Sequence, residues 1–432
     1  MRTVLLCANP LYGHVNPMLA IGRDLAAHGD RVIVLTGSRY ASAAVSSGLE
    51  VRSFHGVADF DEHDPRTFVP HAHRYSGLAL SQYQIESTFI RPIPDQWRAM
   101  SAVLAEEEVD AVLVDSLFLG ALPLMQRPSV ERVPVLVIGI GPLAQLSVDT
   151  PPANSRIPMA SGPLARARNR ILNEMARRVF FAHAQKLAGR LLVEAGGRKP
   201  DGFVIEISRM PERYLQLGPR EFEYERRDLS ENIRFVGPLP AAVTSASAGL
   251  LPDWWSDISD DRPLVHVTQG TLDNNDPTTV IRPTIDALAD LDVQVVVSTG
   301  RAPIESVGPV PANARIAEFL PYDQLLPRCD VMVTNGGYGG VMAGLTAGVP
   351  LVVAGAAEDK PEVAARVEYF GAGLDLRTGR PTPDRVRSAV QTILADGAFR
   401  QRAADLSSAI AGYDPFTSIR TELDGVLGVR HG

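Results

Sequence analysis

The chain has 432 residues, and its 42 Lys and Arg against 50 Asp and Glu give a formal charge of −8. This length suits two domains of roughly 200 residues each, and the mild acidity excludes a general attraction to nucleic acid or to anionic lipid. A composition of 45% hydrophobic and 21% charged residues is typical of a globular enzyme and excludes disorder or a coiled coil as the main state.

The cysteine count and the apolar runs bear on the compartment. Cys7 and Cys329 are the two cysteines, which are too few for a disulfide framework or a structural zinc cluster. The first apolar stretch is short for a secretory signal and lacks a cleavage pattern. The longest apolar run, around residues 133–146, falls short of the ~18 residues that a membrane span needs. We therefore expect a cytoplasmic protein without a membrane span, either a monomer or a homodimer.

The N-terminal half alternates between strand and helix patterns. Apolar runs of strand length lie at 3–8, 31–36, 109–114 and 133–140, and helical patterns lie at 18–27 and 120–126. Parallel strands need such crossovers, so these βαβ units predict a parallel sheet buried on both faces. Residues 54–97 are expected to form irregular loops with one or two short helices. Residues 156–195 are expected to form one or two long amphipathic helices.

A second α/β series follows a linker at residues 236–262, which is rich in small residues and serine. Its predicted strands are 264–268, 293–299, 313–319, 330–334 and 350–354, and its predicted helices are 277–291, 338–347, 361–370 and 383–395. We predict two doubly wound, Rossmann-like domains that face a central cleft, at residues 1–235 and 263–405. Residues 406–432 are expected to form a C-terminal helix that packs back on the first domain.

Ligands of such sheets bind at the carboxyl ends of the strands, so chemistry is sought there. His14 follows the first strand on a glycine-flanked loop, and its imidazole can accept a proton near neutral pH. Asp115 follows a later strand to the same edge, where a carboxylate would fix the tautomer of an imidazole. Structural roles are the alternative, since loop histidines and strand-terminal acids often serve the fold.

In the second half, residues 333–341 run from a strand through several glycines into a helix. Free N–H groups and the helix dipole make such a start an anion site, although a tight turn with packing glycines is the alternative. The spacing is neither a dinucleotide fingerprint nor a Walker loop. Polar and aromatic groups reach the same edge at residues 268–271, 319–322 and 358–360. Together they favour a nucleoside diphosphate linked to a hydroxyl-rich group.

The order and spacing of these segments resemble the inverting, sugar-nucleotide-dependent small-molecule glycosyltransferases of GT-B architecture. This family includes bacterial macrolide and antibiotic enzymes and plant flavonoid enzymes. Gly13-His14-Val15-Asn16-Pro17 matches the family's general-base loop, and Asp115 matches its orienting aspartate. The resemblance implies an acceptor-binding N-terminal domain, with Tyr12 and Gly13 at the acceptor pocket, and a C-terminal domain that binds the nucleotide sugar.

The resemblance also assigns donor contacts across the C-terminal domain. It implies that the base, the diphosphate and the sugar are bound by Thr268, Gln269, Thr271, Phe319, Leu320, Asn335, Gly336, Gly337, Gly339, Gly340, Asp359 and Lys360. Three positions depart from the family pattern: Asn335 replaces a histidine, Ala343 replaces the glutamate that meets the ribose, and Lys360 replaces a glutamine. A deoxyribose donor would miss that glutamate less, so a dTDP-sugar stands beside a UDP-sugar.

The resemblance therefore implies transfer of a hexose to a hydroxyl of a bulky apolar natural product or antibiotic, with inversion and with His14 as general base. No metal and no cofactor beyond the nucleotide sugar is expected. The histidines of residues 54–97 match no metal-ligand spacing, and this segment is expected to line the acceptor pocket. A sugar-nucleotide epimerase and a non-catalytic auxiliary protein, which binds the nucleotide sugar or a glycosyltransferase partner, are the alternatives.

Overall fold

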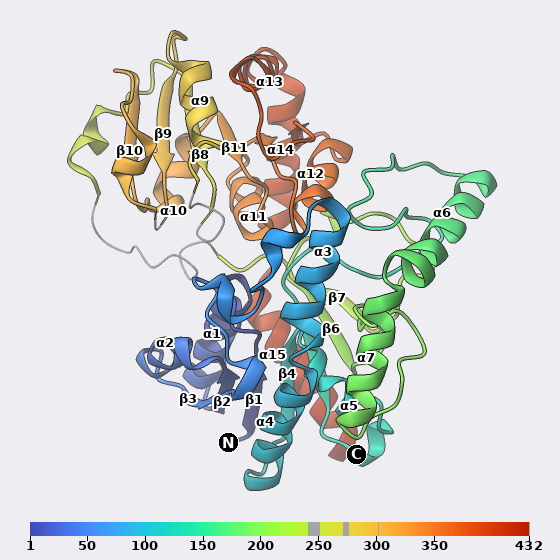
Figure 1. Cartoon of the computed structure of the whole chain (residues 1–432). Coiled ribbons are helices and arrows are strands. Elements are labelled where there is room, and N and C mark those ends of the chain that lie inside the picture. The colour runs from blue at the N-terminus through green and yellow to red at the C-terminus, as the bar shows by residue number, and fades with distance from the viewer. Residues whose placement is uncertain (241–250, 271–275, 301, 432) are drawn as a thin grey trace.

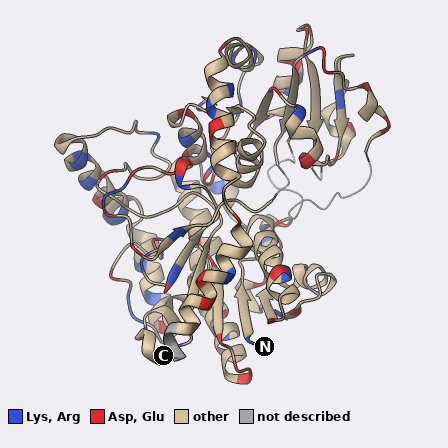
Figure 2. Ribbon diagram, turned by 180° about the vertical axis from the view of Figure 1, so that it is seen from behind, with Lys and Arg blue, Asp and Glu red and all other residues tan. Residues whose placement is uncertain are grey.

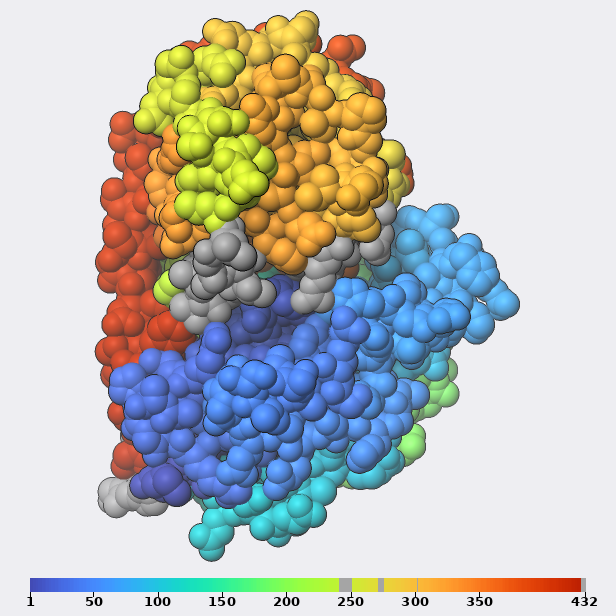
Figure 3. Space-filling view, turned by 90° about the vertical axis from the view of Figure 1, so that its left-hand side faces the viewer, coloured from blue at the N-terminus to red at the C-terminus, as the bar shows by residue number. Residues whose placement is uncertain are grey.

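The computed structural model describes residues 1–240, 251–270, 276–300 and 302–431. They form two α/β domains, one above the other in Figure 1, each a parallel sheet with helices on both faces. From the side, the surface is hollowed where the two domains meet, and the C-terminal segment runs along one flank of both domains (Figure 3). The predicted α/β class with two doubly wound sheets is confirmed.

The N-terminal sheet has the order β3-β2-β1-β4-β5-β6-β7. Its strands are β1 Thr3–Cys7, β2 Arg31–Thr36, β3 Glu50–Ser53, β4 Ala111–Asp115, β5 Val135–Gly139, β6 Arg213–Gln216 and β7 Ile233–Phe235. The order reverses between β1 and β4, whose parallel pairing places Cys7 opposite Val114. This switch point brings the loops after β1 and β4 together, as ligand sites of such sheets require.

The C-terminal sheet has the order β10-β9-β8-β11-β12-β13. Its strands are β8 Leu264–Thr268, β9 Gln294–Ser298, β10 Ala314–Ala317, β11 Val331–Thr334, β12 Leu351–Val353 and β13 Gly373–Asp375. Here the order reverses between β8 and β11, where Thr268 pairs with Thr334. Each domain therefore presents one switch point.

Helices cover both faces of each sheet because the strands are apolar on both sides. They are α1 Tyr12–Ala27, α2 Ala41–Ser46, α3 Gly77–Ile85, α4 Ile93–Glu106, α5 Leu122–Met125, α6 Pro163–Met175, α7 Ala182–Glu194, α9 Ile281–Leu288, α10 Tyr322–Leu325, α11 Tyr338–Thr346, α12 Lys360–Tyr369, α13 Pro383–Ala395, α14 Gly397–Ile410 and α15 Pro415–His431. In β1, Leu5 belongs to a core under α4 and α7, and Leu6 belongs to a core under α1 and α15.

Several elements differ from the sequence expectation. Helix α1 begins at Tyr12 rather than Met18, because the N–H groups of His14 and Val15 bond to the Leu11 carbonyl and the helix tolerates Pro17 inside its second turn. Residues 54–97 contain helix α3 and the start of α4, in line with the one or two short helices expected there, but α4 continues to Glu106. Strands β3, β6 and β7 were not predicted, since they are short and lack a continuous apolar run.

The chain ends on the domain in which it began. After α14, helix α15 crosses back and packs on the N-terminal sheet, where Ile419 and Leu423 are buried in the same core as β1. Arg420 forms an ion pair with Asp24 of α1, and Glu422 lies 2.6 Å from Arg213 of β6. The N-terminal core is therefore completed by the last helix.

Helix α6 projects from the N-terminal domain and carries the arginines that colour it blue in Figure 2. Its inward face is polar: Asn169 donates to the Val148 carbonyl at 3.0 Å, and Asn173 donates to the Ser147 carbonyl at 2.8 Å. Its outward face exposes Leu164 and Ile171. The helix thus anchors the long segment that follows β5. No helix in the described ranges is long and apolar enough to cross a bilayer.

Candidate active site

His14 lies in the first turn of α1, directly above the end of β1 and beside the end of β4. Its Nδ1 is 3.0 Å from Oδ1 of Asp115, and its side chain keeps 13% of its surface exposed. The distance suits an ion pair with a protonated imidazole, although the direction of the N–H does not meet the geometry of a hydrogen bond. Because Nδ1 faces Asp115, Nε2 is the nitrogen left to accept a proton. Phe89 stacks against the ring at 5.7 Å between centroids.

Asp115 is fully buried, and its carboxylate is held by backbone and side-chain donors. Oδ2 accepts the Asn9 backbone N–H at 2.7 Å, Oδ1 accepts the Leu117 N–H at 2.8 Å, and the Asn9 amide lies 3.1 Å from both oxygens. Donors on both oxygens fix the plane of the carboxylate. Asp115 is therefore oriented before any ligand binds.

A buried amide braces this arrangement from behind. Gln96 of α4 donates to Oδ1 of Asn9 at 2.8 Å and accepts the Gly120 N–H at 3.0 Å. Asn9 and Gln96 are both fully buried. The sequence analysis missed Asn9, Gln96 and Phe89, because nothing in their local pattern indicates that three separate segments meet around the pair of His14 and Asp115.

The start of α11 presents free backbone donors to the cleft side of the C-terminal sheet. The first hydrogen bond within the helix runs from Val341 to the Gly337 carbonyl, so the N–H groups of Tyr338, Gly339 and Gly340 precede it. Gly336 has a φ of +86° and turns the chain from β11 into the helix. No atom lies within 4 Å of a Cβ built on Gly339, which leaves room for a ligand. This is an anion-binding arrangement.

The polar side chains predicted beside this helix mainly hold the loops. Nδ2 of Asn335 donates to the Gln269 carbonyl at 2.6 Å, and its Oδ1 faces the Gly337 N–H at 3.4 Å. Oε1 of Gln269 accepts the N–H of Ile281 at 2.9 Å and thereby caps α9. Thr268 accepts the Gly270 N–H at 3.1 Å. Thr271 lies outside the described residues.

The segment predicted to hold the base follows β10. Phe319 is half-buried, whereas Leu320 is 3% exposed and belongs to the core, so the side chain of Leu320 is not open to a ligand. Behind it, the Tyr322 hydroxyl lies 3.1 Å from Nε2 of His266. Burial lowers the pKa of His266 to about 4. His266 is thus a neutral core residue that links the middle of β8 to the Val296 carbonyl of β9 and to Tyr322.

Asp359 lies at the start of α12 and faces the N-terminal domain. Its Oδ2 is 3.4 Å from the position that a Cβ on Gly141 would occupy. Burial raises the pKa of the Asp359 carboxyl, while the neighbouring charges of Lys360 and His14 act to lower that pKa. Lys360 is 5% exposed, and its ammonium pairs with Glu358. Asp359, the predicted sugar contact, therefore lies across the domain boundary from His14, the predicted general base.

Tyr12 and Gly13 begin α1 beside His14. Gly13 is exposed with open space over its Cα, and the Tyr12 ring is partly buried against the α1 core. The acids around the histidines of residues 54–97 are engaged by the fold: Glu62 accepts the Tyr12 N–H at 2.7 Å, and Asp61 pairs with Arg39. This segment closes over the start of α1.

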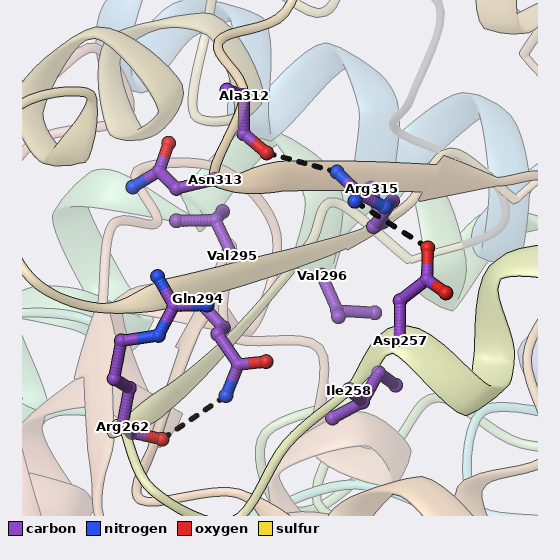
Figure 4. A pocket seen from close by; sticks show the side chains of 9 residues that line it. All are labelled: Asp257, Ile258, Arg262, Gln294, Val295, Val296, Ala312, Asn313 and Arg315. Atoms are coloured by element: carbon purple, nitrogen blue, oxygen red, sulfur yellow. Dashed lines mark hydrogen bonds and ion pairs between the residues drawn. The ribbon is translucent and has the colours of Figure 1, made fainter.

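A separate small cavity lies at the amino ends of β9 and β10 (Figure 4). Its volume is about 40 Å³, enough for a few waters rather than a nucleotide. Arg315 in its wall donates to the Ala312 carbonyl at 2.9 Å, and Gln294 donates to the Arg262 carbonyl at 3.1 Å. Ligands of parallel sheets bind at the opposite, carboxyl ends, so this cavity is not the active site.

Comparisons with known proteins show which family the chain resembles. Residues 282–420 match the family model of the erythromycin biosynthesis protein CIII-like C-terminal domain. The chain is 36% identical to 4'-demethylrebeccamycin synthase of Lentzea aerocolonigenes, covering 98% of this chain and 99% of that protein. It is 34% identical to UDP-glycosyltransferase 2 of Phaeomoniella chlamydospora, covering 98% and 95%. The solved structure of spinosyn rhamnosyltransferase SpnG complexed with thymidine diphosphate is 19% identical, with a TM-score of 0.67 over 98% of this chain and 99% of that one.

Proposed function

The chain belongs to the family of sugar-nucleotide-dependent small-molecule glycosyltransferases with the GT-B fold, and from this premise we propose that it moves a hexose from a UDP- or dTDP-sugar to a hydroxyl of a bulky apolar natural product. The observation that carries the proposal is the pairing of His14 with Asp115 at 3.0 Å. This pair lies at one switch point, and the open start of α11 lies at the other. Base and anion site thus belong to opposite domains.

His14 acts as the general base. Its Nε2 takes the proton of the acceptor hydroxyl as that oxygen attacks the anomeric carbon, and Asp115 stabilises the imidazolium that forms. The attack comes from the side opposite the leaving diphosphate, so the anomeric configuration inverts. The C–O bond to the diphosphate breaks as the new C–O bond forms.

The diphosphate leaves from the start of α11. N–H groups from Tyr338 to Gly340 and the helix dipole stabilise the negative charge that grows on it. This neutralisation requires no metal ion. Phe319 stacks on the base, and Asp359 accepts hydrogen bonds from the sugar hydroxyls.

Both nucleotides remain candidates for the donor. A relative of this chain carries UDP in its name, whereas the SpnG structure holds thymidine diphosphate. Ala343 offers the ribose no carboxylate, which supports a deoxyribose donor. A nucleotide binds the native state and raises its melting temperature, so a thermal-shift panel of UDP, dTDP and their hexoses identifies the preferred base.

The acceptor binds over Gly13 and His14, against the segments from α3 to α4 and from α6 to α7. Phe89 and the half-buried apolar side chains of α3 face a largely apolar ligand. We place the reaction in the cytoplasm, carried out by a monomer or a homodimer. The relatives are named as a glycosyltransferase and a synthase, so neither an epimerase nor an auxiliary protein is proposed.

The test is transfer by the purified protein to a panel of aromatic and macrocyclic alcohols, with product anomers assigned by NMR. His14→Ala is expected to lower kcat by ~10²–10⁴-fold, the usual contribution of a general base. His28→Ala, an exposed histidine at the far end of α1, serves as the matched control. Unchanged turnover in His14→Ala, or a product with retained configuration, contradicts the proposal.

A further inference from the structure

A segment of the N-terminal domain reaches across to the sugar side of the donor site. It follows β5, passes Asp359 at Gly141, is anchored to α6 at residues 147–150, and then contacts the loop between β12 and α12. That loop, residues 354–359, carries the predicted sugar contact at its end. The contact is made by Asn154 and Arg156, which the sequence analysis did not single out.

Asn154 makes three hydrogen bonds to the start of α12. Its backbone N–H donates to Oε2 of Glu362 at 2.8 Å, and its Oδ1 accepts the Glu362 N–H at 3.1 Å. Its Nδ2 donates to the Glu358 carbonyl at 2.8 Å. These bonds bracket Asp359 and Lys360 on both sides. One asparagine therefore fixes where α12 begins.

Arg156 holds the other end of the same loop. Its guanidinium donates to the Gly355 carbonyl and lies 3.6 Å from Oδ1 of Asp375. Gly355 itself has no room for a side chain, because a Cβ there would lie 2.3 Å from the Asn335 carbonyl oxygen. The loop is thus held between Arg156 and the backbone that leads into α11.

The backbone of the contact is strained. Asn154, Arg156 and Glu358 have φ values of 62°, 52° and 56°, and they are three of the four non-glycine residues with positive φ in the described ranges. Such conformations cost about 1–3 kcal/mol each and gather at functional sites when surrounding contacts enforce them. Their concentration at one domain contact indicates that this geometry serves the site.

Glu362 extends the contact into the protein interior. Its second oxygen pairs with Arg366 of α12, which is 1% exposed and lies 2.8 Å from Glu223 of the N-terminal domain. The two domains are thus tied on both sides of α12. A shift of the segment at residues 141–156 would move the start of α12.

We propose that Asn154 and Arg156 are positioning residues for the sugar half of the donor: they hold the loop from Gly355 to Lys360 so that Asp359 meets the sugar opposite His14. This inference rests on the proposed function, because it assigns the sugar to Asp359. It predicts that the contact stabilises the bound sugar and leaves the binding of the base and diphosphate unchanged. The N-terminal domain then contributes to donor recognition through residues that do not touch the nucleotide.

The experiment compares Asn154→Gly and Arg156→Gly with the wild type. Glycine keeps the positive φ and removes the side-chain bonds. Arg377→Gly is the matched control, because Arg377 has the same φ of 52° and its guanidinium pairs with the exposed Glu368. Calorimetry gives the Kd of UDP and UDP-glucose and of dTDP and dTDP-glucose for each protein.

Asn154→Gly and Arg156→Gly are each expected to weaken the binding of the nucleotide sugar about tenfold, as loss of one or two hydrogen bonds implies, with the Kd of the free diphosphate unchanged. Arg377→Gly is expected to match the wild type. Equal losses for diphosphate and sugar nucleotide, or no loss for either, would overturn the positioning role. Sugar-specific binding without transfer in the wild type would instead refute the proposed function, so the two failures are distinguishable.

Discussion

Asp115→Asn tests the carboxylate behind His14 with almost no change of shape. Both oxygens of Asp115 accept a backbone N–H, from Leu117 at 2.8 Å and from Asn9 at 2.7 Å. An asparagine amide must turn its NH₂ group toward one of these two donors, whichever way it is flipped. The substitution therefore places two donors face to face in a fully buried position.

The magnitude follows from that conflict. One buried donor without an acceptor costs about 1–3 kcal/mol, so we expect a loss of about 2 kcal/mol in the free energy of unfolding. The rate should fall much further, because the neutral amide no longer stabilises the imidazolium of His14; the corresponding change in a Ser-His-Asp triad lowers kcat about 10⁴-fold. Transfer kinetics and urea unfolding of the same preparations measure the two effects.

Asp110→Asn is the matched control at the other end of β4. Asp110 is exposed and accepts the Thr3 N–H at 2.7 Å, so its amide can turn the NH₂ group toward solvent, and we expect little change in rate or stability. A double-mutant cycle with His14→Ala should be strongly non-additive, since the two residues act as one unit. Transfer within a few-fold of the wild type in Asp115→Asn, together with the loss of stability, would show that Asp115 serves the fold alone.

Four further substitutions test other parts of the structure. Gly336→Ala should abolish diphosphate binding and lower the melting temperature, because φ is +86° and the new Cβ would lie 2.6 Å from Val353. Gly339→Ala, with open space at its Cβ, should keep the melting temperature and raise the KM for the donor. A normal donor KM in Gly339→Ala would contradict the anion site. Burial holds the pKa of His266 at about 4, below its unfolded value of about 6.5. The contribution of His266 to the free energy of unfolding is therefore complete above pH 6.5 and falls by about 2 kcal/mol between pH 7 and pH 5. His266→Gln should flatten this part of the pH profile measured by urea unfolding, and an unchanged profile would contradict the neutral, buried state assigned to His266. Arg366→Met leaves the buried Glu223 without one of its two arginine partners and should cost about 3 kcal/mol or more of unfolding free energy, and a variant as stable as the wild type would contradict a stabilising role for this interdomain pair.

The sequence predicted the two sheets well because most central strands are unbroken runs of Val, Leu and Ile. Strands such as β4 and β8 are buried along their whole length, and that pattern survives without any knowledge of partners. Strand β6, with Arg213 and Gln216 at its ends, shows no such run. It forms a strand because it pairs with β5 and β7, which its own residues do not indicate. The sequence predicts a loop for the first turn of α1, because Gly13, Asn16 and Pro17 disfavour helices. Packing of Val15 and Met18 on the sheet overrides that preference.

The sequence predicts those parts of the candidate site in which a reactive side chain lies directly at the end of a predicted strand. His14 and Asp115 follow neighbouring strands, so the topology of a doubly wound sheet is enough to bring them together. Asn335 and Gln269 were expected to face the donor. In the structure, the Asn335 side chain donates to the Gln269 carbonyl, and the Gln269 side chain accepts the N–H of Ile281. Asn154 lies 204 residues from Glu358 along the chain, and no local pattern links two such segments.

Helix α15 has a practical consequence for exchanging parts between relatives. The chain passes between the domains twice, between β7 and β8 and again between α14 and α15, and the second passage returns Ile419 and Leu423 to the core around β1. A chimera joined once, between β7 and β8, would import a foreign final helix into a core shaped for another, with Asp24 and Arg213 facing the wrong partners. Grafts that exchange the C-terminal domain should therefore use two junctions, with the second between Ile410 and Pro415, so that each N-terminal domain keeps its own terminal helix.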